Sequence, residues 1–274
     1  MKPLLKWVGG KRWLLPLLQE IWLPHQNKKL VEPFTGGMAV ALGLNPEAAL
    51  LNDANRHLIN FYRQVQKGLV IDQQLKNQAE YYYAMRDKFN NLIINKQHQS
   101  KEAACIFYYL IRTGFNGLCR FNSQGLFNVP FGQHNSIKYK TDFLEYRDIL
   151  KKWQLKSIDF AKLKLDGDEV LYVDPPYDVD FTRYNAHSFT WEDQVRLVAW
   201  LCKHPAPVIA SNQATARILE LYQDNKFTVY TLPAPRKVSC NGDRNPALEI
   251  LAFKNIAPSK LKKLKDQLGC LQSS

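Results

Sequence analysis

Short apolar runs, many of them rich in β-branched residues, recur along the chain and end in polar or turn residues. They are KLVEPF (29–34), ALLND (49–53), EVLYVDPPY (169–177), PVIASN (207–212), FTVYTL (227–232) and LEILAF (248–253). Segments with helical periodicity lie between many of them, including residues 55–68, 192–202 and 213–223. This alternation predicts an α/β fold built on a largely parallel, doubly wound sheet.

Three of these runs end in a carboxylate, namely Glu32, Asp53 and Asp174. Ligands of doubly wound sheets bind beyond the carboxyl ends of the strands, so the repeated pattern predicts a site there. After Asp174, Pro175 and Pro176 restrict the backbone to extended conformations. The sequence therefore places a rigid polar turn, Asp174 to Tyr177, at the end of a buried strand.

The interval from about residue 55 to 160 is rich in Tyr, Gln, Asn and Lys and shows no convincing parallel strand. We interpret residues 55–155 as a mainly helical insertion into a catalytic domain made of residues 1–54 and 156–274. The segment KNIAPSKLKKLKDQLG (254–269) is a candidate basic amphipathic helix, and a solvated surface helix is the simpler interpretation.

The composition favours a polyanionic partner, because 37 Lys and Arg against 25 Asp and Glu give a net charge of +12. A generically basic protein is the alternative.

Five scattered cysteines without C-x-x-C spacing favour a reducing cytosol and neither a disulfide framework nor a zinc site. Lys6, Lys11 and Arg12 interrupt the N-terminal leucines, so we expect no signal peptide and no membrane span.

Two glycine pairs suggest backbone that a ligand can approach closely. LKWVGGKR (5–12) lacks P-loop spacing, and VEPFTGGMAVAL (31–42) leads from a strand through a glycine turn into a helix without a G-x-G-x-x-G pattern. This arrangement of strand, glycine turn and helix is compatible with a small adenosine-bearing ligand. Asp53 can accept hydrogen bonds from ribose hydroxyls, or it can cap the helix that begins near Asn55.

Taken in order, KWVGGK (6–11), EPFTGG (32–37) and DPPY (174–177) resemble the motifs of DNA adenine methyltransferases of the Dam type. The resemblance continues through RTGFNGLCRFNSQGLFNVPFG (112–132) and SNQATARILELY (211–222), with Met38 as a departure from a more usual small residue. It implies a Rossmann-like S-adenosylmethionine-dependent methyltransferase fold with a mainly helical target-recognition insertion.

The resemblance also implies roles for the Asp-Pro-Pro-Tyr turn. Asp174 and the carbonyl of Pro175 would accept the two hydrogens of the adenine amine, and Pro176 would complete the rigid turn. Tyr177 would stack on an adenine rotated out of the duplex. The S-adenosylmethionine site would be lined by Trp7, Lys11, Phe34, Asp53 and Asp174, although Phe34 alone reads equally well as a core aromatic.

Sequence reading would lie in the insertion, with Arg120 and Lys6 reaching guanines and Leu118 and Pro130 packing on a thymine methyl. Phe115 and Asn116 would form a hairpin tip that fills the space left by the adenine. Phosphate or other DNA contacts are expected from Arg112, Asn122 and Lys138. The pattern matches GATC as the target.

These features predict a monomeric, metal-free enzyme that acts on double-stranded DNA in the cytoplasm of a bacterial or phage-infected cell. Two alternatives stay open at this point. One is methylation of another amine, such as an RNA base or a protein glutamine, and the other is a non-catalytic nucleic-acid-binding protein.

Overall fold

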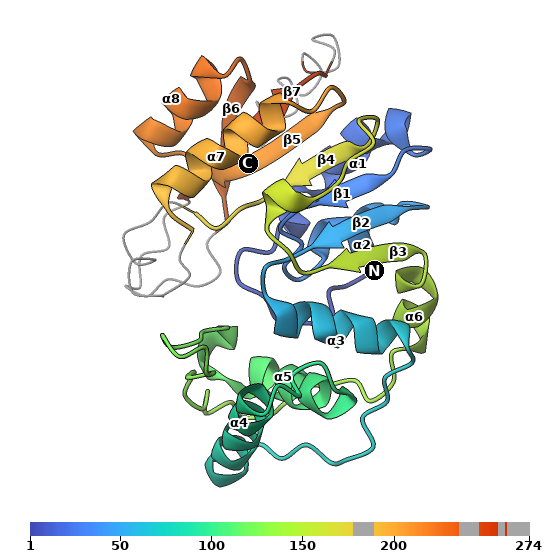
Figure 1. The fold of residues 1–274 in the computed structure, drawn as a ribbon, viewed down its shortest axis with the longest axis vertical. Helices are drawn as coiled ribbons and strands as arrows, with labels where there is room; N and C mark the ends of the chain where they lie inside the picture. The colour runs from blue at the N-terminus through green and yellow to red at the C-terminus, as the bar shows by residue number, and fades with distance from the viewer. Residues whose placement is uncertain (178–188, 236–246, 257–260, 262–274) are drawn as a thin grey trace. The chain divides into compact units, whose positions relative to one another are not determined.

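The computed structural model describes residues 1–177, 189–235, 247–256 and 261 (Figure 1). The chain forms two compact units. Unit 1 comprises Met1–Lys11, Thr35–Asn45 and Leu51–Ile158, and unit 2 comprises Arg12–Phe34, Pro46–Leu50 and Asp159–Ser274. The helix expected over 254–269 lies almost entirely outside the described residues.

Within the described residues, seven strands form one sheet in the order β3-β2-β1-β4-β5-β7-β6. Their bounds are β1 Leu30–Glu32, β2 Ala49–Asn52, β3 Trp153–Lys156, β4 Val170–Val173, β5 Val208–Gln213, β6 Thr228–Ala234 and β7 Ala247–Lys254. Strand β4 pairs in parallel with β1 and with β5, whereas β7 is antiparallel to both β5 and β6. The order 3-2-1-4-5 is that of doubly wound nucleotide-binding sheets, so the predicted α/β class is confirmed.

Six of the strands lie where the apolar runs predict them. Strand β3 was missed, because Trp-Gln-Leu-Lys is only four residues long and stands among lysines. Its burial nevertheless alternates, with Trp153 and Leu155 buried and Gln154 and Lys156 exposed. The sheet is also less parallel than predicted, since β7 runs against both of its neighbours.

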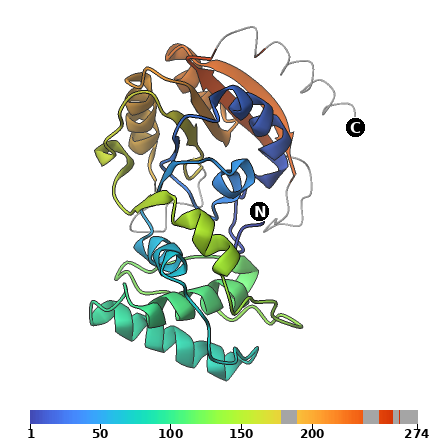
Figure 2. The same cartoon turned by 90° about the vertical axis from the view of Figure 1, so that its right-hand side faces the viewer.

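The helices of unit 2 lie on both faces of its strands, with α7 and α8 on one face and α1 on the other (Figures 1 and 2). Their bounds are α1 Leu15–Trp22, α7 Trp191–Cys202 and α8 Ala216–Asp224. Thr190 and Asp193 form a capping box at the start of α7, and Thr215 caps α8. All four residues of β4 are buried, and Leu171 and Val173 belong to the hydrophobic core, which explains why the strand is continuously apolar.

Unit 1 contains most of the remaining helices, and α5 packs against both α3 and α4. The bounds are α2 Ala39–Leu44, α3 Arg56–Gln66, α4 Ala79–Ile94, α5 Lys101–Thr113 and α6 Leu144–Leu150. Short 3-10 helices are η1 Arg12–Leu14, η2 Leu23–His25, η3 Phe115–Gly117 and η4 Phe160–Lys162. Phe61 of α3 stacks on Tyr108 of α5 with ring centroids 5.3 Å apart, so aromatic contacts join these two helices.

None of the helices that the structure describes is both long and apolar enough to cross a membrane.

Candidate active site and recognition loop

The turn from Asp174 to Tyr177 follows directly after β4 in unit 2. Asp174 is half-buried and Pro175 is buried. The Oγ atom of Ser211, at the end of β5, donates a hydrogen bond of 2.9 Å to Oδ1 of Asp174. The hydroxyl of Tyr172 lies 3.2 Å from the same Ser211 Oγ. One oxygen of the Asp174 carboxylate is therefore held in place from the neighbouring strand.

A second set of hydrogen bonds holds the same turn from helix α7. Nε2 of Gln194 donates to the carbonyl oxygen of Pro176 over 2.9 Å. Nδ2 of Asn212 in turn donates to Oε1 of Gln194 over 3.0 Å. Both amide side chains are fully buried. The turn is thus fixed at its carboxylate and at a backbone carbonyl.

Two tyrosines, Tyr172 and Tyr177, lie near the carboxylates of Asp174 and Glu249. Burial, followed by the negative charge of Asp174, raises the pKa of Tyr172 and of Tyr177 well above the usual value of 10.0. The charge of Glu249, on β7, acts in the same direction on both. Both phenols are therefore neutral at physiological pH.

Phe34 follows β1 and lies at the border of the unit 2 core. It packs at 5.5 Å against Phe160 and edge-to-face at 5.4 Å against Phe189. Its side chain is half-buried and packs against the core. Core packing accounts for part of its surface, and the exposed remainder can contact a ligand.

In unit 1, the ring of Trp7 lies over the glycine turn that follows β1. A Cβ atom on Gly36 would be 2.9 Å from Nε1 of Trp7, and one on Gly37 would be 2.9 Å from its Cβ. Gly36 also has a φ of +46°. Glycine is therefore required at both positions because a side chain would clash with Trp7, and at Gly36 also because of its positive φ.

The other glycine pair has a different environment. Gly9 has a φ of +80° and no atom within 4 Å of the position that a Cβ would take. Lys11, which is only 3% exposed, donates from Nζ to the carbonyl of Gly9 over 3.0 Å. The buried lysine thus shapes an open backbone turn that a ligand can approach closely.

Asp53 follows β2, and its carboxylate accepts two backbone hydrogen bonds. Oδ2 accepts from the amide of Gly36 over 3.0 Å, and Oδ1 accepts from the amide of Asn55 over 2.9 Å. Burial raises the pKa of Asp53, while these two bonds act in the opposite direction. Each carboxylate oxygen can accept a further hydrogen bond, so the group can still bind ribose hydroxyls.

The helix that follows is capped by Asn55. Its Oδ1 accepts from the amides of His57 and Leu58 at 3.0 and 3.2 Å. The alternative interpretation of Asp53 as the cap of this helix is therefore wrong. Nδ2 of Asn55 also donates to Sγ of Cys119 over 3.3 Å, and burial raises the pKa of that thiol to about 12.

Residues 114–132, here called the candidate recognition loop, are closed by an antiparallel bridge between Gly114 and Phe131. A small hairpin lies inside the loop, with a bridge between Phe121 and Phe127. Oδ1 of Asn122 accepts from the amides of Gln124 and Leu126 at 3.0 and 2.9 Å. Asn122 thereby organises the tip of this hairpin.

Phe115 and Asn116 were expected at the hairpin tip, and this placement is wrong. They lie in η3, near the base of the loop, because the turn residues Asn122 to Gly125 form the tip instead. Phe115 is 46% exposed, and Asn116 has a φ of +52°. The stem of Lys6 lies beside η3, since a Cβ on Gly117 would be 3.3 Å from Lys6 Cγ and Cδ.

Arg120 is exposed, and its guanidinium is oriented by Asn128 on the opposite side of the hairpin. Nε donates to Oδ1 of Asn128 over 2.8 Å, and Nη2 donates to its carbonyl oxygen over 3.1 Å. Two of the five N–H groups are thus engaged in a fork, which fixes the plane that the others present.

The other predicted DNA contacts also lie in unit 1. Pro130 and Lys138 are exposed, and Leu118 is half-buried. Arg112 is half-buried, with its guanidinium 5.3 Å from the centre of the Tyr108 ring. This cation–π contact holds the guanidinium against the ring.

Four residues that sequence reasoning did not single out hold the predicted ones. Ser211 and Gln194 hold the Asp174–Tyr177 turn, Asn55 lies beside Asp53, and Asn128 orients Arg120. The only sequence pattern that pointed to any of them was Ser-Asn-Gln at the end of a buried strand, which contains Ser211.

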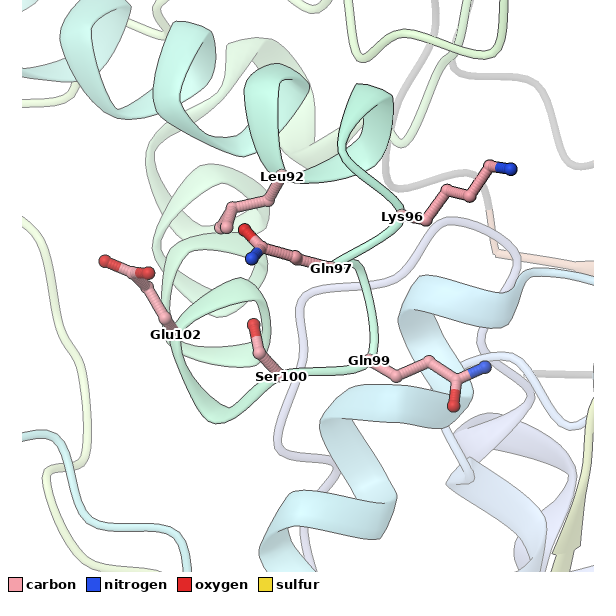
Figure 3. A pocket seen from close by; sticks show the side chains of 6 residues that line it. All are labelled: Leu92, Lys96, Gln97, Gln99, Ser100 and Glu102. Carbon is pink, nitrogen blue, oxygen red and sulfur yellow. The ribbon is translucent and has the colours of Figure 1, made fainter.

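Two further features lie apart from these residues. An open pocket where α4 leads into α5 is lined by Leu92, Lys96, Gln97, Gln99, Ser100 and Glu102 (Figure 3). It contains none of the predicted site residues. In the part of the chain that the structure describes, no group of three or more His, Cys, Asp or Glu side chains could hold a metal ion.

The fold and these motifs define the class of α/β methyltransferases: a glycine turn after β1, a carboxylate after β2 and a rigid Asp-Pro-Pro-Tyr turn after β4. The chain belongs to the family of D12 class N6 adenine-specific DNA methyltransferases, whose family model matches residues 7–237.

Named relatives agree with this family. The chain is 36% identical to the Type II methyltransferase M1.LlaDCHI of Lactococcus lactis subsp. cremoris, over 86% of this chain and 89% of that protein. It is 34% identical to the DNA adenine methylase of Escherichia coli K12, over 91% of this chain and 94% of that protein. It is 36% identical to the DNA N-6-adenine-methyltransferase of Escherichia phage P1 over 92% of this chain, but it spans 35% of that protein's length.

Proposed function

We propose that this protein methylates N6 of adenine within GATC in double-stranded DNA, using S-adenosylmethionine and rotating the adenine out of the duplex. Membership of the adenine-specific family supports the choice of base and of nucleic acid. The observation that supports the chemistry best is the Asp174–Tyr177 turn, whose carboxylate and backbone are both held by buried side chains.

The exocyclic amine of adenine is a poor nucleophile, because its lone pair is delocalised into the ring. Asp174 and the carbonyl of Pro175 accept its two hydrogens and so localise the lone pair on nitrogen. Acceptors held in place before the reaction stabilise the developing charge without reorganisation. No base needs to remove a proton beforehand, since the methylated ammonium loses one readily to water.

S-adenosylmethionine supplies a methyl group on a positively charged sulfonium sulfur. The residues present fit such a ligand: Asp53 retains accepting capacity for ribose hydroxyls, and the open turn at Gly9 leaves its backbone accessible. In unit 1, we assign Trp7 to apolar contact with the ligand and Lys11 to shaping the turn. In unit 2, we assign Phe34 and Asp174 to its apolar and polar contacts.

DNA recognition is assigned to unit 1. Arg120 and Lys6 contact guanines, with Arg120 presenting a plane fixed by Asn128. Phe115, exposed on η3, fills the space left by the rotated adenine together with Asn116. The remaining assigned contacts are Leu118 and Pro130 to thymine, and Arg112, Asn122 and Lys138 to the backbone. Tyr177 of unit 2 stacks on the adenine.

The cellular setting that we propose is a bacterial or phage-infected cell, because the named relatives come from bacteria and from a phage. There the enzyme acts as a monomer on double-stranded DNA. The proposed reaction needs no metal ion, since hydrogen-bond acceptors alone activate the amine.

Transfer of a tritiated methyl group to duplex DNA, RNA and protein tests this function against its alternatives. We expect label in duplex DNA only, and a rate of labelling lower by about 10²-fold or more when Asp174→Ala replaces the wild-type protein. Label in RNA or protein would favour methylation of another amine. Binding of DNA without any transfer by the wild-type protein would indicate a non-catalytic nucleic-acid-binding protein.

A further inference from the structure

The Ser-Asn-Gln segment at the end of β5 has no role in the proposed function, yet two of its side chains serve the Asp174–Tyr177 turn. Ser211 donates to the carboxylate of Asp174, and Asn212 donates to the amide of Gln194. Gln194 donates to the carbonyl of Pro176. All three side chains have an exposed fraction of 0%.

Burying three polar side chains in an otherwise apolar core costs free energy unless each one finds a partner. Here each of the three side chains donates to the turn or to the residue that holds it, and Oδ1 of Asn212 also accepts from the amide of Gln213 over 2.8 Å. The hydroxyl of Tyr172, 3.2 Å from Ser211 Oγ, extends the network on the other side of the serine. Such a network gives the turn one geometry, because any other position of Asp174 or Pro176 would leave a buried donor without its acceptor.

We propose that Ser211 and the Gln194–Asn212 pair are positioning residues for methyl transfer, which rests on the proposed function of the Asp174–Tyr177 turn. Ser211 donates to Oδ1 of Asp174 and so restrains the carboxylate that is assigned to the adenine amine. Gln194 fixes the Pro176 carbonyl and with it the direction of the preceding Pro175 carbonyl. Catalytic groups must be held within about 0.5 Å of their productive geometry, and these bonds supply that restraint.

The first test compares Ser211→Ala and Gln194→Met with a matched control, Thr215→Ala. Thr215 caps α8 a few residues after Ser211, so its loss lowers stability without touching the turn. We expect kcat at saturating DNA and S-adenosylmethionine to fall about 10- to 100-fold in each turn variant, as for loss of a hydrogen bond to a charged or preorganised group. The dissociation constants for DNA and cofactor should change less than about threefold, since the bonds act on the reacting geometry.

The second test is a double-mutant cycle between Ser211→Ala and Asp174→Asn. If Ser211 acts through Asp174, its removal should change the residual rate of Asp174→Asn less than about twofold. Ser211→Thr, which keeps a hydroxyl, should recover most of the rate lost in Ser211→Ala. Multiplicative effects in the cycle, or a Thr215→Ala variant as slow as Ser211→Ala, would overturn the proposal.

The two proposals fail in different ways. A wild-type protein that transfers no methyl group to duplex DNA contradicts the proposed function itself. A wild-type protein that does transfer, with Ser211→Ala and Gln194→Met at wild-type kcat, contradicts only the positioning role.

Discussion

At the scale of single residues, the proposed reaction depends on one carboxylate, Asp174, which directly follows β4. Asp174 is half-buried, and Ser211 holds one of its oxygens at 2.9 Å. Its position was predictable, because an acid followed by two prolines at the end of an apolar run has little conformational freedom. The partners Ser211 and Gln194 were not predictable, since they approach from β5 and α7, far away in the sequence.

Replacing Asp174 by Ala should lower kcat by about 10²- to 10³-fold or more, because a preorganised acceptor is lost. DNA affinity, measured by fluorescence anisotropy with a labelled duplex, should stay close to that of the wild type, since the carboxylate is assigned to the adenine amine and not to the DNA backbone. Near wild-type turnover in this variant would remove the Asp-Pro-Pro-Tyr turn from the mechanism.

Replacing Arg120 by Ala should relax selection at one outer G·C pair of GATC, because a bidentate arginine–guanine contact contributes about 1–3 kcal/mol of discrimination. Lys138→Ala is the control, since loss of a phosphate contact weakens methylation of all sites alike and reduces the salt dependence. Rates on GATC and on each single-base variant, at two salt concentrations, measure both effects. A uniform loss in Arg120→Ala would assign the arginine to the DNA backbone.

At the scale of elements, the start of α3 joins two parts of unit 1. The amide of Asn55 donates to Asp53, its Oδ1 caps α3, and its Nδ2 donates to Cys119 in the candidate recognition loop. A single asparagine therefore connects the carboxylate assigned to the ribose with the loop that contains Arg120. The sequence allowed Asp53 to bind the ribose or to cap α3, and the geometry assigns the cap to Asn55.

Asp53→Ala and Asn55→Ala should therefore have different effects. Loss of Asp53 should raise the KM for S-adenosylmethionine, because the ribose acceptor is gone. Loss of Asn55 should lower the free energy of unfolding by about 0.5–2 kcal/mol through the cap, whereas Asn55→Ser should retain most of it. Calorimetry for cofactor affinity and denaturant unfolding for stability separate the two. An Asp53→Ala variant with unchanged cofactor affinity and lowered stability would contradict the ribose assignment.

Most strands could be predicted from the sequence, because their β-branched runs are long enough to show a pattern. The four residues of β3 could not be predicted in this way, and neither could the position of the hairpin tip. The turn residues of the tip lie in the segment Asn122 to Gly125, whereas Phe115 and Asn116 were placed at the tip only because of the family resemblance. The predicted boundaries of the insertion, 55–155, stay a prediction, since unit 1 also includes Met1–Lys11 and Thr35–Asn45.

At the scale of the whole molecule, acid should destabilise the fold through one buried histidine. His57 is stacked on Phe121 at 5.0 Å and also contacts the rings of Phe89 and Phe107. Burial, followed by the charges of Arg56 and His98, lowers the pKa of His57 from 6.5 to about 3. Between these two values the unfolded chain binds a proton that the folded chain does not.

The stability contributed by neutral His57 is therefore complete above pH 6.5 and decreases as the pH falls toward about 3. The expected slope is at most about 1.4 kcal/mol per pH unit from this residue. His57→Phe should flatten the pH dependence of the free energy of unfolding over that range. An unchanged slope in the variant would assign the acid sensitivity to other groups.

The net charge of +12 indicated a polyanionic partner from composition alone, but it did not indicate which base is modified. That choice is the central claim, and one measurement tests it directly. A duplex with a single GATC is incubated with the protein and S-adenosylmethionine, cut with nucleases that respond oppositely to adenine methylation at GATC, and analysed for modified nucleosides. We predict N6-methyladenine at this site and none in a duplex whose GATC carries a single-base change; an unmodified GATC, or equal methylation of both duplexes, would contradict the account.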